Sequence, residues 1–289
     1  MNRLPPGSNP MGVALALVLI IIFWGSSFIS IKFALEGFPP FMLGGLRFSI
    51  AGGILFGVAL ASGYGWPTAE QWRSGVIVGT IMLAVNSSSI IFAEQTIASG
   101  LAAIGVATIP LWTALFTGIL QKWPRPLEWI ALGIGFSGIL LLNLEGDFQA
   151  SPLGAFLILL TAVSWALGSV LAARLPLPGG PMTVAVEMLP ASAIMLTASL
   201  LTGERLSAMP PLMPTLVMGY FIISSLGAFT AHAYLLRRVR PVVANSFAYT
   251  NPLVAVSLGV ALGGETISVY GLGAMVVVLL GLALLTLAR

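Results

Sequence analysis

The sequence predicts an all-α polytopic membrane protein in which ten transmembrane helices form two inverted repeats of five. Composition supplies the first observation: 58% of the 289 residues are apolar, and only 12 are basic and 9 acidic. A soluble globular surface is normally about a quarter charged, so these side chains cannot cover one. The second observation is a series of apolar stretches of about 20 residues, the length of a helix that crosses a hydrocarbon core.

Each predicted span is an apolar run that is bounded by proline, glycine or charge. The first run is longer than the apolar region of a cleaved signal peptide, so we expect it to be retained as a span. Ten spans leave only about 80 residues for loops and ends, which is too few for a soluble domain. The runs cover residues 12–34, 39–62, 74–93, 98–121, 126–144, 152–174, 182–202, 213–236, 242–262 and 268–288.

Basic residues favour one orientation of these spans. Basic side chains in bacterial membrane proteins concentrate on the cytoplasmic side. With a cytoplasmic N-terminus, Arg205 is alone in an outer loop, and nine residues lie on the cytoplasmic side: Arg3, Arg73, Lys122, Arg125, Arg174, Arg237, Arg238, Arg240 and Arg289. The sequence therefore predicts a multi-pass protein of a bacterial-type inner membrane with both termini in the cytoplasm.

An internal repeat connects the two halves of the chain. Pro110 in the fourth span matches Pro252 in the ninth, and Trp24 in the first span matches Trp165 in the sixth. Five spans per half is an odd number, so the second half enters the membrane upside down relative to the first, as in many secondary transporters. The predicted halves are residues 1–148 and 149–289.

Several of these residues also suggest a family. The chain carries, in this order, the stretch Phe23–Phe28 (FWGSSF), the mid-span Pro110, a glycine-containing fifth span, the pair Asn251–Pro252 and a glycine-containing tenth span. In these features the chain resembles the EamA branch of the drug/metabolite transporter superfamily. The resemblance implies two inverted five-helix repeats and a central cavity lined by spans one, three, four, six, eight and nine. It also implies export of amino acids or related metabolites, the aromatic amino-acid exporters being one group of relatives.

The two mid-span prolines predict kinks. Because proline has no N–H, the carbonyls of Val106 and Ala248 lose their helical partners. Inside a bilayer such carbonyls must be satisfied by protein, water or ligand. We expect Pro110 and Pro252 to be gating positions beside a substrate; the alternative is a kink that serves packing only.

Aromatic and polar side chains inside the spans are candidates for substrate contact. Tryptophan normally prefers the membrane interface, so tryptophans at mid-depth indicate a cavity or a hydrogen-bond partner. The ninth span carries the densest polar cluster. The predicted substrate-binding residues are Trp24, Ser27, Asn86, Trp112, Trp165, Asn245, Ser246, Tyr249 and Asn251. Helix packing is the alternative for the tryptophans, and an interhelical hydrogen bond is the alternative for Asn86, which follows a Gly75–Gly79 step suited to close helix contact.

Three ionisable residues inside spans are candidates for ion or proton coupling. Charges at membrane depth are costly and normally face the protein interior. Arg47 lies in the second span, Glu187 in the seventh and His232 in the eighth. Arg47 and Glu187 fall at opposite depths, so we expect no direct pair between them. The alternatives are an extended side chain that reaches the interface and, for His232, an interfacial polar residue.

These patterns predict a secondary transporter that exports small metabolites, chiefly aromatic or apolar amino acids, by alternating access. The chain has one histidine, no cysteine and no H-E-x-x-H or G-x-S-x-G motif, so we expect no enzymatic activity, no metal and no cofactor. A formal charge of +3 does not indicate a nucleic-acid partner. The expected partners are the substrate and the lipid bilayer, with the chain a monomer or a homodimer. Export of other metabolites or organic cations and passive conduction of small solutes remain alternatives.

The orientation can be tested by labelling. A cysteine introduced at Gln149, in the loop between the predicted halves, should react with an impermeant thiol reagent added to intact cells, because this loop is expected outside. The reagent's mass shift on the purified protein measures the reaction. Labelling that occurs only after the inner face is opened would contradict the ten-span arrangement.

Overall fold

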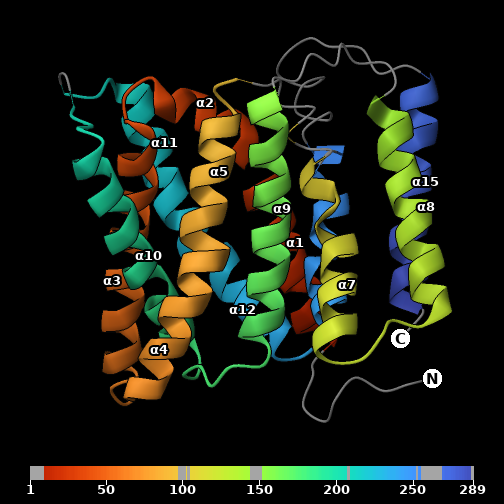
Figure 1. Cartoon of the computed structure of the whole chain (residues 1–289), viewed down its shortest axis with the longest axis horizontal. Coiled ribbons are helices and arrows are strands. Elements are labelled where there is room, and N and C mark those ends of the chain that lie inside the picture. Colours follow the sequence, from red (N-terminus) through yellow and green to blue (C-terminus); the bar gives the residue numbers. More distant parts are fainter. Residues whose placement is uncertain are drawn as a thin grey trace.

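The computed structural model describes residues 10–96, 102, 105–143, 152–206, 209–251, 253–254 and 269–287. Within these ranges the chain is helical and contains no strand (Figure 1). The first half contains α1 (Pro10–Gly25), α2 (Ser27–Leu35), α3 (Pro40–Ala61), α4 (Ala69–Val78), the π-helix η1 (Gly79–Val85), α5 (Asn86–Ala93), α7 (Ile109–Leu120) and α8 (Pro126–Asn143). The second half contains α9 (Pro152–Ala172), α10 (Pro181–Leu201), α11 (Leu212–Ser224), the π-helix η2 (Ser225–Phe229), α12 (Thr230–Leu236), α13 (Pro241–Ala244), the 3₁₀-helix η3 (Asn245–Tyr249) and α15 (Val269–Leu287).

The described helices include several that are long and apolar enough to cross a membrane. Five qualify by length and composition: Pro40–Ala61, Ala69–Ala93, Pro152–Ala172, Pro181–Leu201 and Leu212–Leu236. Three shorter apolar helices cover Pro10–Gly25, Gly105–Leu120 and Leu272–Leu285. The prediction of a polytopic, all-helical membrane protein is therefore confirmed, while the count of ten crossings stays a prediction.

Local sequence explains where the third span begins. Hydropathy predicts a start near residue 74, whereas the helix begins at Ala69. Thr68 caps it: the Thr68 hydroxyl accepts from the Gln71 N–H, and the Gln71 side chain accepts from the Thr68 N–H. This reciprocal capping box stabilises a polar first turn that an apolar window cannot detect.

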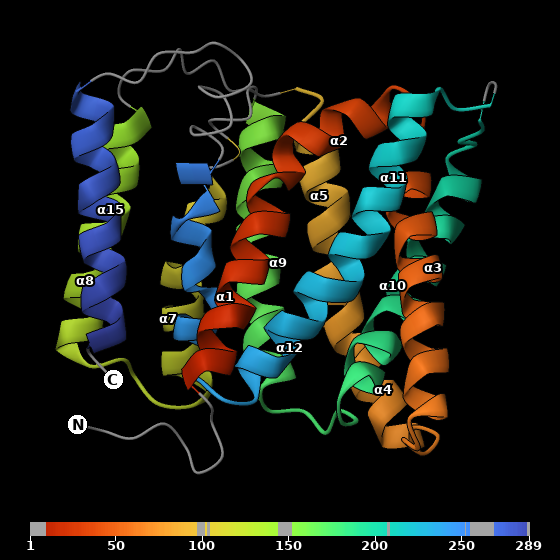
Figure 2. The ribbon, with the colours of Figure 1, turned by 180° about the vertical axis from the view of Figure 1, so that it is seen from behind.

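The helices form a central bundle with one helix pair at each end. Figures 1 and 2 show α3 beside α10 at one end and α8 beside α15 at the other. Glycine permits the second pair to approach closely: a Cβ on Gly281 of α15 would lie 2.5 Å from the Gly135 Cα of α8, and one on Gly138 would lie 2.7 Å from the Val278 nitrogen. Each end pair joins one helix from each half of the sequence.

The first and last described helices meet the same face of the bundle. Figure 1 shows that α1 begins and α15 ends on the lower side, so the described chain enters and leaves on one face. This arrangement is what an even number of crossings requires. That this face is cytoplasmic stays a prediction from the positions of the basic residues.

Several long helical segments are interrupted near their middle. The first span breaks at Ser26 between α1 and α2. The third contains η1 and the eighth contains η2, two π-helical segments at equivalent positions of the predicted repeat. A π-helical turn shifts the register of the side chains after it and is frequent at functional sites. Both segments border the same pocket, since Asn86 follows η1 and Phe229 ends η2.

The predicted glycine step of the third span is confirmed as a close helix contact. A Cβ on Gly75 would collide with the Val186 carbonyl oxygen of α10, and one on Gly79 with the Glu187 carbonyl oxygen. Small residues let helix backbones approach in this way and increase their dispersion contacts. The backbones of α4, η1 and α10 are therefore in direct contact.

We expect Gly79→Ala to destabilise the protein, because its new methyl group can be relieved only by separating η1 from α10. Overpacking of this kind costs about 1–3 kcal/mol, enough to lower the thermal midpoint by several degrees. The measurement is thermal unfolding of the purified protein in detergent. The matched control is Gly57→Ala in α3, whose Cβ would meet no atom within 4 Å; equal midpoints for both variants would contradict the close contact.

Candidate functional site

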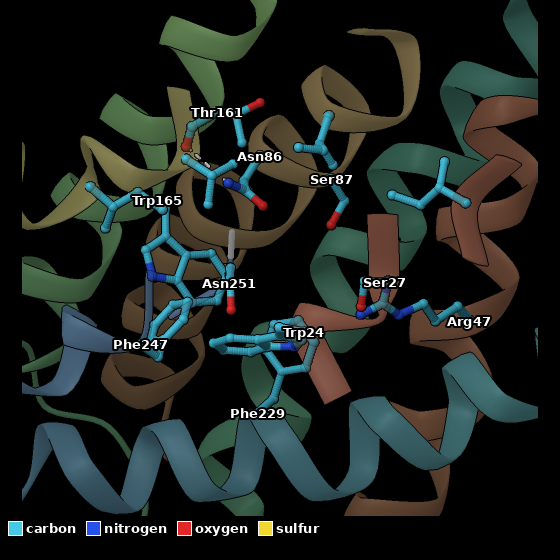
Figure 3. Close-up of a pocket in the computed structure, with 14 residues that line it drawn as sticks. Trp24, Ser27, Arg47, Asn86, Ser87, Thr161, Trp165, Phe229, Phe247 and Asn251 are labelled. Carbon is cyan, nitrogen blue, oxygen red and sulfur yellow. Dashed lines mark hydrogen bonds between the residues drawn. The ribbon is translucent and has the colours of Figure 1, made fainter. Parts of the chain in front are cut away.

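A pocket of about 90 Å³ lies inside the central bundle, near the middle of α9 (Figure 3). Its walls come from the six spans that the family resemblance implies, with one further side chain, Arg47, from α3. The lining residues are Trp24, Ser27, Ile31, Arg47, Asn86, Ser87, Ile90, Val106, Ile109, Thr161, Trp165, Phe229, Phe247 and Asn251. Residues of both halves therefore meet around one pocket.

Aromatic rings form one wall of this pocket. Trp24 lies edge-to-face against Trp165, Phe229 and Phe247, with ring centroids 4.8, 5.1 and 4.7 Å apart. Such tilted geometries place a positive ring edge against a negative ring face. Figure 3 shows Trp24, Trp165 and Phe247 grouped on one side of the pocket and Arg47 with Ser27 on another.

Asn245 fixes the position of Trp165 through a buried hydrogen-bond network. Its Oδ1 accepts from Trp165 Nε1 at 3.1 Å and lies 2.9 Å from His232 Nε2. Its Nδ2 donates to the Thr113 hydroxyl at 2.9 Å. Because the indole N–H can only donate, the atom facing it must be the amide oxygen, and His232 must therefore carry a proton on Nε2. The Asn245 side chain is fully buried and occupied by protein partners.

Two buried polar atoms of the pocket have no partner among the described residues. They are Trp24 Nε1, a donor, and Asn251 Oδ1, an acceptor. Leaving such a group unsatisfied typically costs about 1–3 kcal/mol. An unsatisfied donor and an unsatisfied acceptor in one cavity indicate a place where water or a ligand completes the hydrogen bonding.

Asn86 makes the interhelical hydrogen bond considered from the sequence and also lines the pocket. Its Nδ2 donates to the Thr161 carbonyl at 2.9 Å, which joins α5 to α9, so the predicted interhelical hydrogen bond is confirmed. The same residue lines the pocket, beside Ser87. Ser27, from α2, also lines it and donates its hydroxyl to the Phe23 carbonyl at 2.8 Å.

Four residues expected at the site are absent from the pocket lining: Asn245, described above, and three others. Tyr249 packs against α8, where its hydroxyl donates to the Leu132 carbonyl at 3.1 Å. Ser246 donates to the Val243 carbonyl within its own segment. Trp112 is half-buried and stacks on Phe116 of the same helix. The pocket lining includes none of the three.

Of the two prolines expected at kinks, the structure describes Pro110 but not Pro252. Pro110 lies at the start of α7, directly after a turn at Thr108, so the helix is interrupted where the sequence predicts a kink. Val106, whose carbonyl lacks a proline N–H partner, lines the pocket. Pro252 lies outside the described residues, but its neighbour Asn251 is also a lining residue.

The two remaining candidates for coupling share a second, smaller cavity. Glu187 and His232 line a space of about 10 Å³ together with Thr183 and Arg237. Arg237 donates to the Thr183 hydroxyl and to the Pro178 carbonyl. Arg47 lines only the larger pocket of the two, in agreement with the expectation that Arg47 and Glu187 do not pair.

Phe229 and Phe247 are pocket residues that the sequence interpretation missed. Phe229 ends the π-helix η2, and Phe247 lies in the 3₁₀-helix η3. Assigning faces at 3.6 residues per turn misplaces side chains in both kinds of helix. The available signal was that both follow small or polar residues in spans already expected to border the cavity.

No cluster of three or more histidine or acidic residues suited to a metal ion occurs in the ranges that the structure describes. The pocket therefore offers aromatic faces, hydroxyls, amides and one guanidinium as its chemistry. This set suits the reversible binding of a small organic molecule with an apolar part and a polar part.

Glu94 is an unusual carboxyl just beyond the end of the span Ala69–Ala93. Both of its oxygens are buried and lack hydrogen-bond partners among the described residues. Burial raises the pKa of this carboxyl to about 8, although the positive charge of Lys32 opposes the shift. The folded protein therefore holds Glu94 protonated over a range in which the unfolded chain would ionise it.

We expect Glu94→Gln to stabilise the protein at high pH only. Between about pH 4.5 and 8 the buried carboxyl makes folding progressively less favourable as pH rises, because the unfolded chain releases the proton first. The thermal midpoint of the variant should exceed that of the parent by a few degrees at pH 9 and equal it at pH 4. Glu70→Gln, at an exposed carboxyl, is the control; a pH-independent difference for Glu94→Gln would contradict the raised pKa.

Comparison with known proteins identifies a family and several relatives to which the chain is similar. The EamA-like transporter family matches residues 11–144 and, a second time, residues 152–287. The uncharacterized inner membrane transporter YedA of Escherichia coli K12 is 41% identical over 276 residues, which cover 95% of this chain and 90% of YedA. The probable amino-acid metabolite efflux pump of the same organism is 31% identical over 157 residues, covering 53% of this chain and 50% of that protein. One solved crystal structure has a TM-score of 0.79 at 22% identity over 98% of this chain and 100% of the other; it shows the fold alone.

Proposed function

The chain belongs to the EamA-like transporter family, and we propose that it is a secondary transporter that exports aromatic or apolar amino acids by alternating access. The observation that carries the proposal is the pocket lined by residues of both halves, which combines a cluster of aromatic rings with unsatisfied polar atoms. Sites of secondary transporters commonly lie at such a repeat interface, near the middle of interrupted helices.

The chemistry of the pocket supports amino acids as substrates. The rings of Trp24, Trp165, Phe229 and Phe247 offer an apolar surface for a side chain. Asn251 Oδ1 accepts and Trp24 Nε1 donates, so the two atoms suit a group that carries both an ammonium and a carboxylate. The partial similarity to a probable amino-acid metabolite efflux pump agrees with this class.

The size of the pocket sets a condition on the largest substrates. About 90 Å³ is less than the roughly 150 Å³ of a cavity that binds benzene. Leucine and phenylalanine are both larger than benzene, so the walls must move apart for either of them, and further for the aromatic one. The interruptions at Ser26, in η1 and in η2 are where the helices around the pocket can bend to widen it.

Counterflow in proteoliposomes tests the carrier mechanism. Vesicles that contain the purified protein and unlabelled L-leucine or L-phenylalanine should take up the labelled amino acid faster than protein-containing vesicles without internal amino acid. A carrier's site reorients to the outside more quickly when it is loaded with substrate. A passive channel shows no such acceleration. Equal uptake with and without internal amino acid, at saturating and at trace concentrations, would favour a channel over a carrier.

We expect Trp24→Ala to raise the half-saturation concentration for L-leucine about threefold to thirtyfold, because one ring contact contributes about 0.5–2 kcal/mol. The loss should be larger for L-phenylalanine. Trp129→Ala is the control, because Trp129 lies in α8, outside the pocket lining, and is 37% exposed. Trp24→Leu, which keeps apolar bulk but removes the ring, serves if the alanine variant does not fold; unchanged affinity in the Trp24 variants would contradict the pocket as the substrate site.

A further inference from the structure

Arg47 is the charged side chain in the lining of the central pocket, which includes no aspartate or glutamate. It belongs to α3, a helix that the family resemblance does not place around the cavity, and it is 9% exposed. A buried charge in a span is costly and is normally retained for pairing or for function. The contacts of the Arg47 guanidinium show whether the charge is paired within the protein or is available for function.

The guanidinium of Arg47 is enclosed on several sides by aromatic rings. Its Cζ lies 5.0 Å from the ring centroids of Phe48 and Phe221 and 5.5 Å from that of Phe229. Its Nε donates to the Ser225 hydroxyl at 2.6 Å. Ring faces attract the cation, and the serine fixes its orientation. For the two terminal nitrogens, Nη1 and Nη2, the described part of the chain supplies no hydrogen-bond partner.

The charge of Arg47 has no counter-ion in the described part of the chain. The side-chain ion pair found there joins Arg240 to Glu128, which lie outside the pocket lining. A guanidinium remains charged at any physiological pH, so the free-energy cost of removing its charge from water is not relieved by loss of a proton. Figure 3 shows Arg47 reaching toward Ser27 at one side of the pocket, so an anion there would complete the pair.

The amine of a substrate meets different chemistry. The described lining supplies neutral acceptors, of which Asn251 Oδ1 is unpartnered, but no carboxylate. An ammonium group therefore gains a hydrogen bond to a neutral amide rather than an ion pair. Charge-assisted bonds to a guanidinium are roughly twice as strong as neutral ones. The anionic end of the substrate is expected to dominate recognition.

We propose, on the basis of the function given above, that Arg47 binds the carboxylate of the exported molecule through Nη1 and Nη2. The carboxylate is then the required group and the amine an accessory one. The site accepts small apolar carboxylates, either zwitterionic or monoanionic, and rejects amines and amino-acid amides of the same shape. The fork of two N–H donors matches the two oxygens of a carboxylate, a geometry that lysine does not reproduce.

Four ligands with one hydrocarbon skeleton test this preference. Calorimetric titration of the purified protein compares L-leucine, 4-methylpentanoate, which lacks the amine, L-leucinamide, which lacks the charge of the carboxylate, and 3-methylbutylamine, which lacks the carboxylate. The first two should bind within about tenfold of each other, and the last two at least tenfold more weakly. Equal binding of L-leucine and L-leucinamide would overturn the proposal.

Variants assign the preference to Arg47. In Arg47→Gln the two carboxylates should weaken about tenfold or more, to the level of the amide, while the amide itself changes little. Arg47→Lys keeps the charge and should retain part of the preference. The matched control is Arg238→Gln, which removes an arginine that lies over Tyr234 outside the pocket lining and should keep the order of the four ligands. A full preference in Arg47→Gln would overturn the assignment.

The outcomes separate this proposal from the function on which it rests. Counterflow of leucine without any carboxylate preference leaves the amino-acid carrier standing and overturns the Arg47 site. Binding of 4-methylpentanoate without leucine supports the site and contradicts the amino-acid cargo. If Arg47→Gln does not fold, the wild-type ligand series and Arg47→Lys decide, and no binding of any of the four ligands contradicts both proposals.

Discussion

The side chain of Asn245 is the interaction on which the centre of this structure depends. From one residue of η3 it binds Thr113 of α7, Trp165 of α9 and His232 of α12, all of them buried. Removing it would leave two buried donors, Trp165 Nε1 and His232 Nε2, unsatisfied at once, whereas the Thr113 hydroxyl would keep its bond to the Ile109 carbonyl. The orientation of Trp165, and with it the aromatic wall of the pocket, follows from this amide.

Hydropathy and charge were sufficient to predict a polytopic all-helical fold, because bilayer thickness constrains span length and every backbone polar group must be paired within the helix. They were less informative about the site. Trp24, Asn86 and Asn251 line the pocket, whereas Tyr249 turns toward α8 to donate to a carbonyl there. Regular helix periodicity could not separate these cases, because η1, η2 and η3 change the register near the pocket.

The pocket and its surroundings show how a membrane protein keeps polar groups without destabilising its spans. The side-chain amides of Asn86 and Asn245 donate hydrogen bonds to residues of neighbouring helices. Asn251 and Trp24 leave an acceptor and a donor free beside the cavity. The first kind of residue holds the bundle together, and the second kind makes it receptive to a ligand. The hydrogen bonds of Asn86 and Asn245 stabilise the bundle, and this stability offsets the free-energy cost of the unsatisfied atoms of Asn251 and Trp24.

The helix pairs at the two ends of the bundle have a consequence for how the protein is built and moves. Because α3 packs on α10 and α8 packs on α15, each pair draws one member from either half of the sequence. The halves are thus interlocked and do not sit side by side as separable bodies. Residues 1–148 expressed alone would expose the faces of α3 and α8 that α10 and α15 cover in the whole chain. A rigid group that contains either end pair therefore mixes helices from both halves of the sequence.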